Sequence, residues 1–132
     1  MRTAGNYVDD AGFGSLAYGV AALKIPLIVV LGHEACGAVA AATDVVNSNS
    51  KLPVSLTRMV EPILPAVIDA KANLKAGENL VDAAILNNTR RVALELRDAS
   101  DPIIGEPVKQ GKVMVVPAVY SLKTGAVTFL EL

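Results

Sequence analysis

The residues best suited to chemistry lie together at positions 32–37, which read Gly-His-Glu-Ala-Cys-Gly. His33 and Cys36 are three positions apart, and each is the only residue of its type in the chain. A neutral imidazole and a thiolate at this spacing can bind one Zn²⁺ from a single turn. Taken alone the pair is a weak motif, because a lone cysteine is more often a small buried apolar residue and motif matches need context.

The elements around this turn would place it at the carboxyl end of a strand. An unbroken aliphatic run from Leu27 to Leu31 precedes it, a pattern typical of a parallel strand that is covered on both faces. Small residues at 38–46 predict a helix directly after it. The turn therefore follows the carboxyl end of a buried strand, where open α/β sheets place ligand sites.

The rest of the chain alternates between helical and strand patterns. Apolar spacing predicts a helix over residues 13–24, with Ser15 as its cap. Two helical patterns follow within 52–96, and Pro62 and Pro65 indicate a start or a kink in the first of them. The remaining predicted elements are a loop or short helical turn at 101–111, a buried strand at 113–116, and a hairpin into an edge strand at 120–132. This alternation predicts a single α/β domain over residues 1–132, with a mostly parallel sheet flanked by helices.

Composition excludes several classes of protein. The 132 residues are 52% hydrophobic and 19% charged, with a formal net charge of −1, so global disorder is excluded and neither nucleic acid nor an anionic membrane is an expected partner. No apolar run is long enough to span a membrane, and the first residues lack the apolar stretch of a signal peptide. A single cysteine is compatible with a reducing compartment, and a cytoplasmic location is expected.

Four segments together resemble one enzyme family. Residues 32–38, Gly-His-Glu-Ala-Cys-Gly-Ala, resemble the Gly-His-x-x-Cys-Gly-Ala signature of the β-class carbonic anhydrases. Arg-Thr-Ala-Gly-Asn at 2–6, Ser-Leu-Ala-Tyr at 15–18 and Ala-Val-Tyr-Ser-Leu-Lys-Thr-Gly at 118–125 resemble the family's Arg-x-Ala-Gly-Asn segment, its Ser-Leu-x-Tyr helix and its closing hairpin, in the same order. The resemblance covers essentially the whole chain and implies a zinc lyase that interconverts CO2 and bicarbonate.

The same resemblance implies roles for particular residues. In that family two cysteines and one histidine hold zinc, so His33 would be the histidine ligand and Cys36 the second cysteine. The backbone amide of Gly37 would face the substrate or bicarbonate oxygens, a use that unpaired donors at a helix start favour. Gly5 would help to line the same pocket, because it lacks a side chain.

One part of the family pattern is absent. The family's first zinc cysteine lies in a Cys-x-Asp-x-Arg segment on a strand before Arg-x-Ala-Gly-Asn, whereas this sequence begins at Met1-Arg2. We therefore expect a truncated β-carbonic-anhydrase-like fold that lacks its first strand. That strand lies beside the strand at 27–31 in the family, so we also expect the middle of the sheet to be bare and two or more chains to associate over it, as a dimer or higher homo-oligomer.

The missing cysteine leaves the function open between alternatives. A catalytic zinc usually needs about three protein ligands, and His33 and Cys36 supply two. Asp9, Asp10 or Glu34 could add a carboxylate, or another chain could supply a ligand, although Glu34 is expected to point to solvent or the first helical turn. The alternatives to an active enzyme are an inactive family relative that acts as a binding or oligomerisation module, and a small anion-binding α/β domain that uses the turn as an anion nest.

Overall fold

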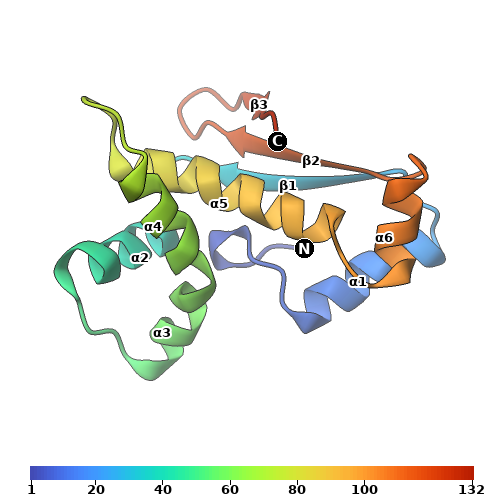
Figure 1. The fold of residues 1–132 in the computed structure, drawn as a ribbon, viewed down its shortest axis with the longest axis horizontal. Helices are drawn as coiled ribbons and strands as arrows, with labels where there is room; N and C mark the ends of the chain where they lie inside the picture. The colour runs from blue at the N-terminus through green and yellow to red at the C-terminus, as the bar shows by residue number, and fades with distance from the viewer.

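A computed structural model describes all residues from Met1 to Leu132 (Figure 1). In chain order its elements are η1 (Ala4–Asn6), α1 (Asp10–Ala21), β1 (Leu27–His33), α2 (Gly37–Ser48), α3 (Val54–Val60), η2 (Glu61–Ile63), α4 (Leu64–Ala72), α5 (Leu80–Arg97), α6 (Pro102–Lys109), β2 (Met114–Tyr120) and β3 (Val127–Phe129). The predicted α/β class is confirmed, and each predicted strand is present.

The sheet has three strands in the order β1-β2-β3. β1 and β2 are parallel over seven register pairs, from Leu27 opposite Met114 to His33 opposite Tyr120. β3 pairs with β2 in the antiparallel sense, which confirms the predicted edge hairpin. The second strand is longer than the predicted 113–116, because its ladder with β1 continues as far as Tyr120.

One prediction about β1 is wrong. Its burial alternates, with Ile28 and Val30 buried and Leu27, Val29 and Leu31 exposed by 42–46%, so only one face of the strand is covered. β1 pairs with β2 along its whole length and is the outermost strand of the order β1-β2-β3, so its other edge has no strand partner. This open edge is the position beside residues 27–31 where the missing strand was expected, and the unpaired backbone groups of an edge strand favour pairing with another chain.

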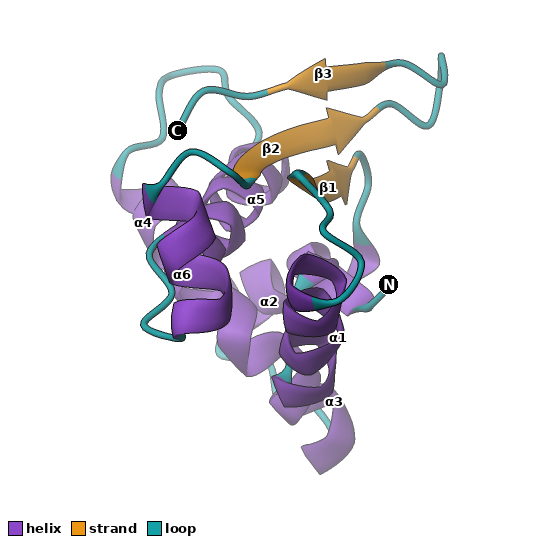
Figure 2. Cartoon of the chain, turned by 90° about the vertical axis from the view of Figure 1, so that its right-hand side faces the viewer, coloured by secondary structure: helices purple, strands orange, loops and turns teal.

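Two apolar clusters form the core, one toward each end of α5. Helices α1 and α6 lie at one end of the sheet and α2, α3 and α4 at the other, while α5 runs along it (Figures 1 and 2). The first cluster contains Ala17, Val20, Ile28, Val30, Val92, Ala93, Leu96, Ile104, Val113 and Val115. The second contains Cys36, Val39, Ala42, Val60, Ile63, Val67, Ala70, Ala84 and Ile85. The carboxyl end of β1 meets the second cluster through the turn into α2.

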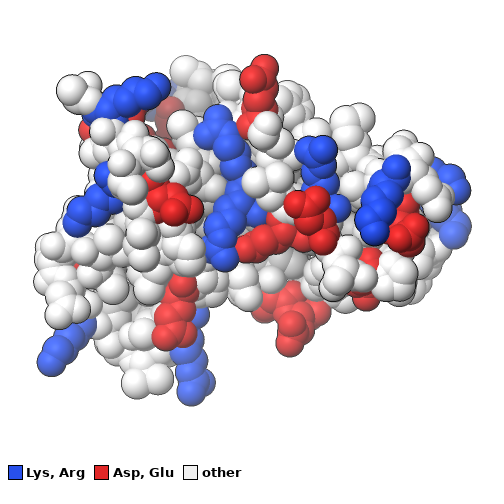
Figure 3. Space-filling model, viewed as in Figure 1, with Lys and Arg blue, Asp and Glu red and all other residues white.

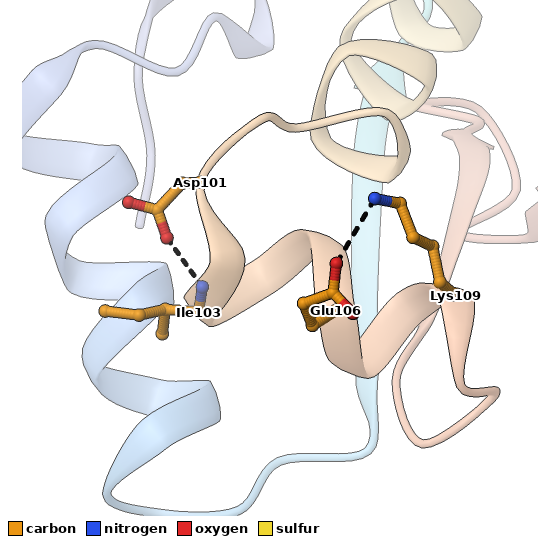
Figure 4. Close-up of polar contacts among 4 residues, drawn as sticks. All are labelled: Asp101, Ile103, Glu106 and Lys109. Carbon is orange, nitrogen blue, oxygen red and sulfur yellow. Dashed lines mark hydrogen bonds and ion pairs between the residues drawn. The ribbon is translucent and has the colours of Figure 1, made fainter.

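Local capping by an aspartate marks the starts of α1 and α6. The Asp9 carboxylate accepts a hydrogen bond of 2.7 Å from the Gly12 N–H, so α1 begins three residues earlier than predicted, and Ser15 lies inside it instead of capping it. At α6, Asp101 accepts from the Ile103 N–H at 2.8 Å, and Lys109 lies 3.3 Å from Glu106 (Figure 4). These contacts stabilise an eight-residue helix where a loop or a short helical turn was predicted.

Charged side chains of both signs are mixed on the face of the molecule drawn in Figure 3, where lysine and arginine are interspersed with aspartate and glutamate. The ion pair of 2.7 Å between Arg91 and Glu95 is partly exposed on α5, and pairs of this kind contribute little to stability. None of the helices is both long and apolar enough to cross a membrane.

Candidate functional site

The predicted site turn joins β1 directly to α2. β1 ends at His33, a short turn follows, and α2 begins at Gly37. Ala35 in this turn has a φ of 51°, in the left-handed region that non-glycine residues seldom adopt. The turn therefore reverses the chain in few residues and places His33 and Cys36 on either side of a strained position.

His33 is exposed at the end of the strand. Its Nδ1 lies 2.8 Å from the backbone oxygen of Glu34. Because a carbonyl oxygen can only accept, Nδ1 carries the proton of the neutral ring and Nε2 keeps a free lone pair. A histidine held in this way presents Nε2 as a metal ligand or as a hydrogen-bond acceptor.

Cys36 has different surroundings. Its residue is 5% exposed and belongs to the apolar cluster formed by α2, α3, η2, α4 and α5. The thiol is free, and it makes no capping hydrogen bond to the start of α2. The structure thus places His33 at the surface and Cys36 in the core, one at each end of the same turn.

The two predicted anion-binding glycines lie near each other. Gly37 is exposed at the first position of α2, whose initial backbone donors have no side-chain cap. Gly5 is buried with a φ of 65°, and a Cβ built on it would lie 3.7 Å from the Ala38 Cβ and would overlap the Ile63 side chain. The start of α2 and the η1 segment are therefore packed together, and only glycine fits at position 5.

Glu34 does not point to solvent or to the first turn of α2, and that prediction is wrong. Its Oε2 accepts hydrogen bonds of 3.0 Å from the Ser121 hydroxyl and of 3.0 Å from the Leu122 N–H. Its own N–H donates to the Tyr120 oxygen at 3.1 Å. No local pattern in the sequence indicates this pairing, because the partners are 87 and 88 residues away.

A cleft of about 680 Å³ lies beside β1 and reaches the start of the turn at Gly32 and His33. Its lining consists of Met1, Arg2, Thr3, Asn6, Val8, Leu16, Ile28, Val29, Val30, Leu31, Gly32, His33, Leu96, Tyr120 and Leu122. His33 lines this cleft, whereas Cys36, Gly37 and Gly5 do not. Asn6 was not among the predicted site residues, and its Nδ2 is the one buried side-chain polar atom without a hydrogen-bond partner.

The donor set within one chain does not fit a catalytic zinc. Such a site needs about three protein ligands, and no group of three or more His, Cys, Asp or Glu side chains is close enough to hold a metal ion. Of the three carboxylates considered, Glu34 is engaged by Ser121 and Leu122, Asp9 caps α1, and Asp10 is exposed in the first turn of α1. His33 and Cys36 are therefore the only two predicted ligands, and any further ligand has to come from outside this chain.

Comparison with known proteins points to a single family. The family model described as carbonic anhydrase matches residues 1–127. The chain is 34% identical to a carbonic anhydrase of Mycolicibacterium smegmatis over 96% of its length and 60% of that protein. It is 36% identical to carbonic anhydrase 2 of Mycobacterium tuberculosis over 95% of its length and 58% of that protein. The chain thus spans about three-fifths of these relatives.

The fold comparison gives the same result. A tetrameric β-carbonic anhydrase of the filamentous ascomycete Sordaria macrospora superposes with a TM-score of 0.81 at 23% identity, over 100% of this chain and 67% of that one. At this identity the likeness concerns the fold alone. The family match over nearly the whole chain and the shared fold show that the chain belongs to the β-carbonic anhydrase family.

Proposed function

We propose that this chain takes part in the zinc-dependent interconversion of CO2 and bicarbonate, with a third zinc ligand supplied from outside the chain. The observation that carries the proposal is the turn after β1, where His33 and Cys36 flank one tight reversal next to the uncapped start of α2. Relatives at 34% and 36% identity bear the name carbonic anhydrase. Zinc is the cofactor that family membership supports.

The residues of the chain would contribute binding and orientation. The hydrogen bond from Nδ1 to the Glu34 oxygen holds the His33 ring with Nε2 free. The first backbone N–H groups of α2, beginning at Gly37, favour an anion such as bicarbonate through their positive partial charge. Gly5 lets η1 approach the start of α2 closely.

We propose also that the chain works as a homo-oligomer, a dimer or a larger assembly. One face of β1 leaves Leu27, Val29 and Leu31 exposed by 42–46%, and such an open apolar strand favours association. The Sordaria relative is tetrameric. Since His33 is exposed, a neighbouring copy could approach it and add the ligand that one chain lacks. The free thiol of Cys36 is compatible with the reducing cytoplasm as the place where the protein acts.

Stopped-flow CO2 hydration tests this function. The zinc-supplemented chain is assayed over concentrations at which sedimentation shows it to be dissociated and then associated. We expect hydration per chain to rise with association and to be lost in His33→Ala and Cys36→Ser. Glu61→Ala is a matched control, because Glu61 is exposed on η2 and its side chain makes no hydrogen bond or ion pair. If the associated, zinc-bearing protein hydrates CO2 no faster than buffer alone, the proposal is contradicted.

A second function is favoured by the incomplete ligand set. With only two predicted ligands in one chain, a family member without hydration activity could still bind a small anion at the start of α2. The same assay separates the two, because that protein would bind bicarbonate without hydrating CO2. Bicarbonate binding that survives Cys36→Ser while hydration stays at background would support this second function.

A further inference from the structure

We propose that Glu34 is a positioning residue, which holds the His33 ring and the adjoining wall of the cleft in one arrangement. The proposal rests on the proposed function only for the role of His33; the arrangement itself can be measured in the metal-free protein. Glu34 follows the last residue of β1, and its carboxylate bonds to the segment after β2. It thereby connects the two strand ends beyond the point where their ladder stops.

Four hydrogen bonds meet at Glu34. Its Oε2 accepts from the Ser121 hydroxyl and from the Leu122 N–H, each at 3.0 Å. Its backbone N–H donates to the Tyr120 oxygen at 3.1 Å. Its backbone oxygen accepts from His33 Nδ1 at 2.8 Å. The backbone oxygen that orients the imidazole is therefore part of a residue that is itself held on both its amide and its carboxylate.

Three of the four hydrogen-bond partners of Glu34 are also residues of the cleft. Tyr120 and Leu122 line the cleft together with His33. The last register pair of the parallel ladder is His33 with Tyr120, so the contacts of Glu34 extend this pairing by one residue. Without the carboxylate, the turn after β2 would keep its internal bonds, Ser121 N–H to Ala126 O and Gly125 N–H to Ser121 O, both 2.9 Å. Those bonds close the turn on itself but do not fix it to β1.

The chemistry of the contact favours a geometric role. Both donors to the carboxylate are neutral, and neither of the ion pairs in the structure includes Glu34. An ionised acceptor strengthens such bonds relative to neutral pairs. A glutamine at this position keeps one side-chain acceptor oxygen of the same reach, whereas alanine removes it. Rescue by glutamine therefore distinguishes positioning from a requirement for charge.

The test uses the fact that His33 is the only histidine. Nitrogen-15 NMR of the histidine-labelled, metal-free chain at a pH where the ring is neutral reports its tautomer, and amide hydrogen exchange reports the Leu122 N–H. We expect the Nδ1–H tautomer in the unmodified chain. Glu34→Ala should shift the ring signals toward the tautomer mixture of a free imidazole and speed Leu122 exchange by about tenfold, the size of one lost hydrogen bond. Glu34→Gln should keep both properties, and Glu61→Ala should leave them unchanged.

Two outcomes would overturn the proposal: an unchanged His33 tautomer in folded Glu34→Ala, or a tautomer shift of equal size in Glu61→Ala. If Glu34→Ala does not fold, Ser121→Ala removes one of the two donors and should give a smaller shift in the same direction; no shift there would also overturn it. The readouts require neither zinc nor CO2. If Glu34→Ala does not change the His33 tautomer, the role of Glu34 is contradicted. If Glu34→Ala changes the tautomer but the protein does not hydrate CO2, only the proposed function is contradicted.

Discussion

The side-chain amide of Asn88 donates a hydrogen bond of 2.7 Å to the backbone oxygen of Gly5, across 83 residues of sequence. Asn88 lies on α5 and is 2% exposed, so the bond is made inside the protein. Through it the central helix holds η1 against the start of α2, where the site turn ends. The position of the site thus depends on a buried polar contact as well as on the apolar core.

Replacing Asn88 by alanine should destabilise the fold. The Gly5 oxygen would lose its buried donor, and an unsatisfied buried group costs about 1–3 kcal/mol. Urea denaturation of Asn88→Ala should therefore show a lower midpoint and an unchanged slope. Asn87→Ala is the matched control, because the neighbouring asparagine is half-buried and its side chain makes no hydrogen bond. Equal midpoints for the two variants would show that the contact with Gly5 contributes nothing.

Gly5→Ala should be costly for two independent reasons. The φ of 65° disfavours any L side chain by roughly 1–2 kcal/mol, and the new Cβ would overlap Ile63. Gly14→Ala is the opposite case, because a Cβ at that exposed position in α1 meets nothing within 4 Å, and the change should stabilise by roughly 0.5–1 kcal/mol. Thermal unfolding should show a lower midpoint for Gly5→Ala and a higher midpoint for Gly14→Ala. Stability of Gly5→Ala equal to that of the unmodified chain would contradict the packing of η1 described above.

Gly32→Ala should disturb the carboxyl end of β1 through a clash with Thr89. A Cβ on Gly32 would overlap the hydroxyl of Thr89, which is fully buried and donates to the Ile85 oxygen at 2.8 Å. Thr89→Ala removes the overlapping atom, so the double variant should be less destabilised than the sum of the single ones. Additive losses in free energy of unfolding would mean that the two residues do not meet.

Leu31→Lys tests association through the open face of β1. Leu31 is 44% exposed, so the substitution should change the free energy of unfolding by less than about 0.5 kcal/mol. A charge on this face should nevertheless weaken any apolar contact between copies, and sedimentation velocity should show dissociation at concentrations where the unmodified chain is associated. An unmodified chain that stays monomeric at micromolar concentration, or unaltered association of the variant, would contradict the proposed interface.

Sequence patterns predicted the elements well because local rules set them. The apolar run at 27–31 and the small residues after position 37 gave the strand and the helix on either side of the turn. The length of the helix at 102–109 was underestimated, because its start depends on one capping hydrogen bond to Asp101. The order of motifs, more than any single spacing, indicated the family that the comparison then showed.

Long-range features could not be predicted in the same way. Burial on both faces of β1 was expected from its aliphatic run, but which face is covered depends on where α1 and α5 pack. The direct pairing of β1 with β2 follows from backbone hydrogen bonding that no residue type encodes. The contacts of Glu34 and of Asn88 join residues more than 80 positions apart, so neither has a local signal.

The central claim is that one chain supplies only two zinc ligands, and metal stoichiometry tests it most directly. The dilute, monomeric chain is dialysed against buffered zinc and then against a competing chelator, and bound metal is measured by mass spectrometry. We predict zinc well below one per chain, removed by the chelator, with none bound by His33→Ala or Cys36→Ser. One zinc per monomer that resists the chelator would contradict the claim, because a complete ligand set would then exist within residues 1–132.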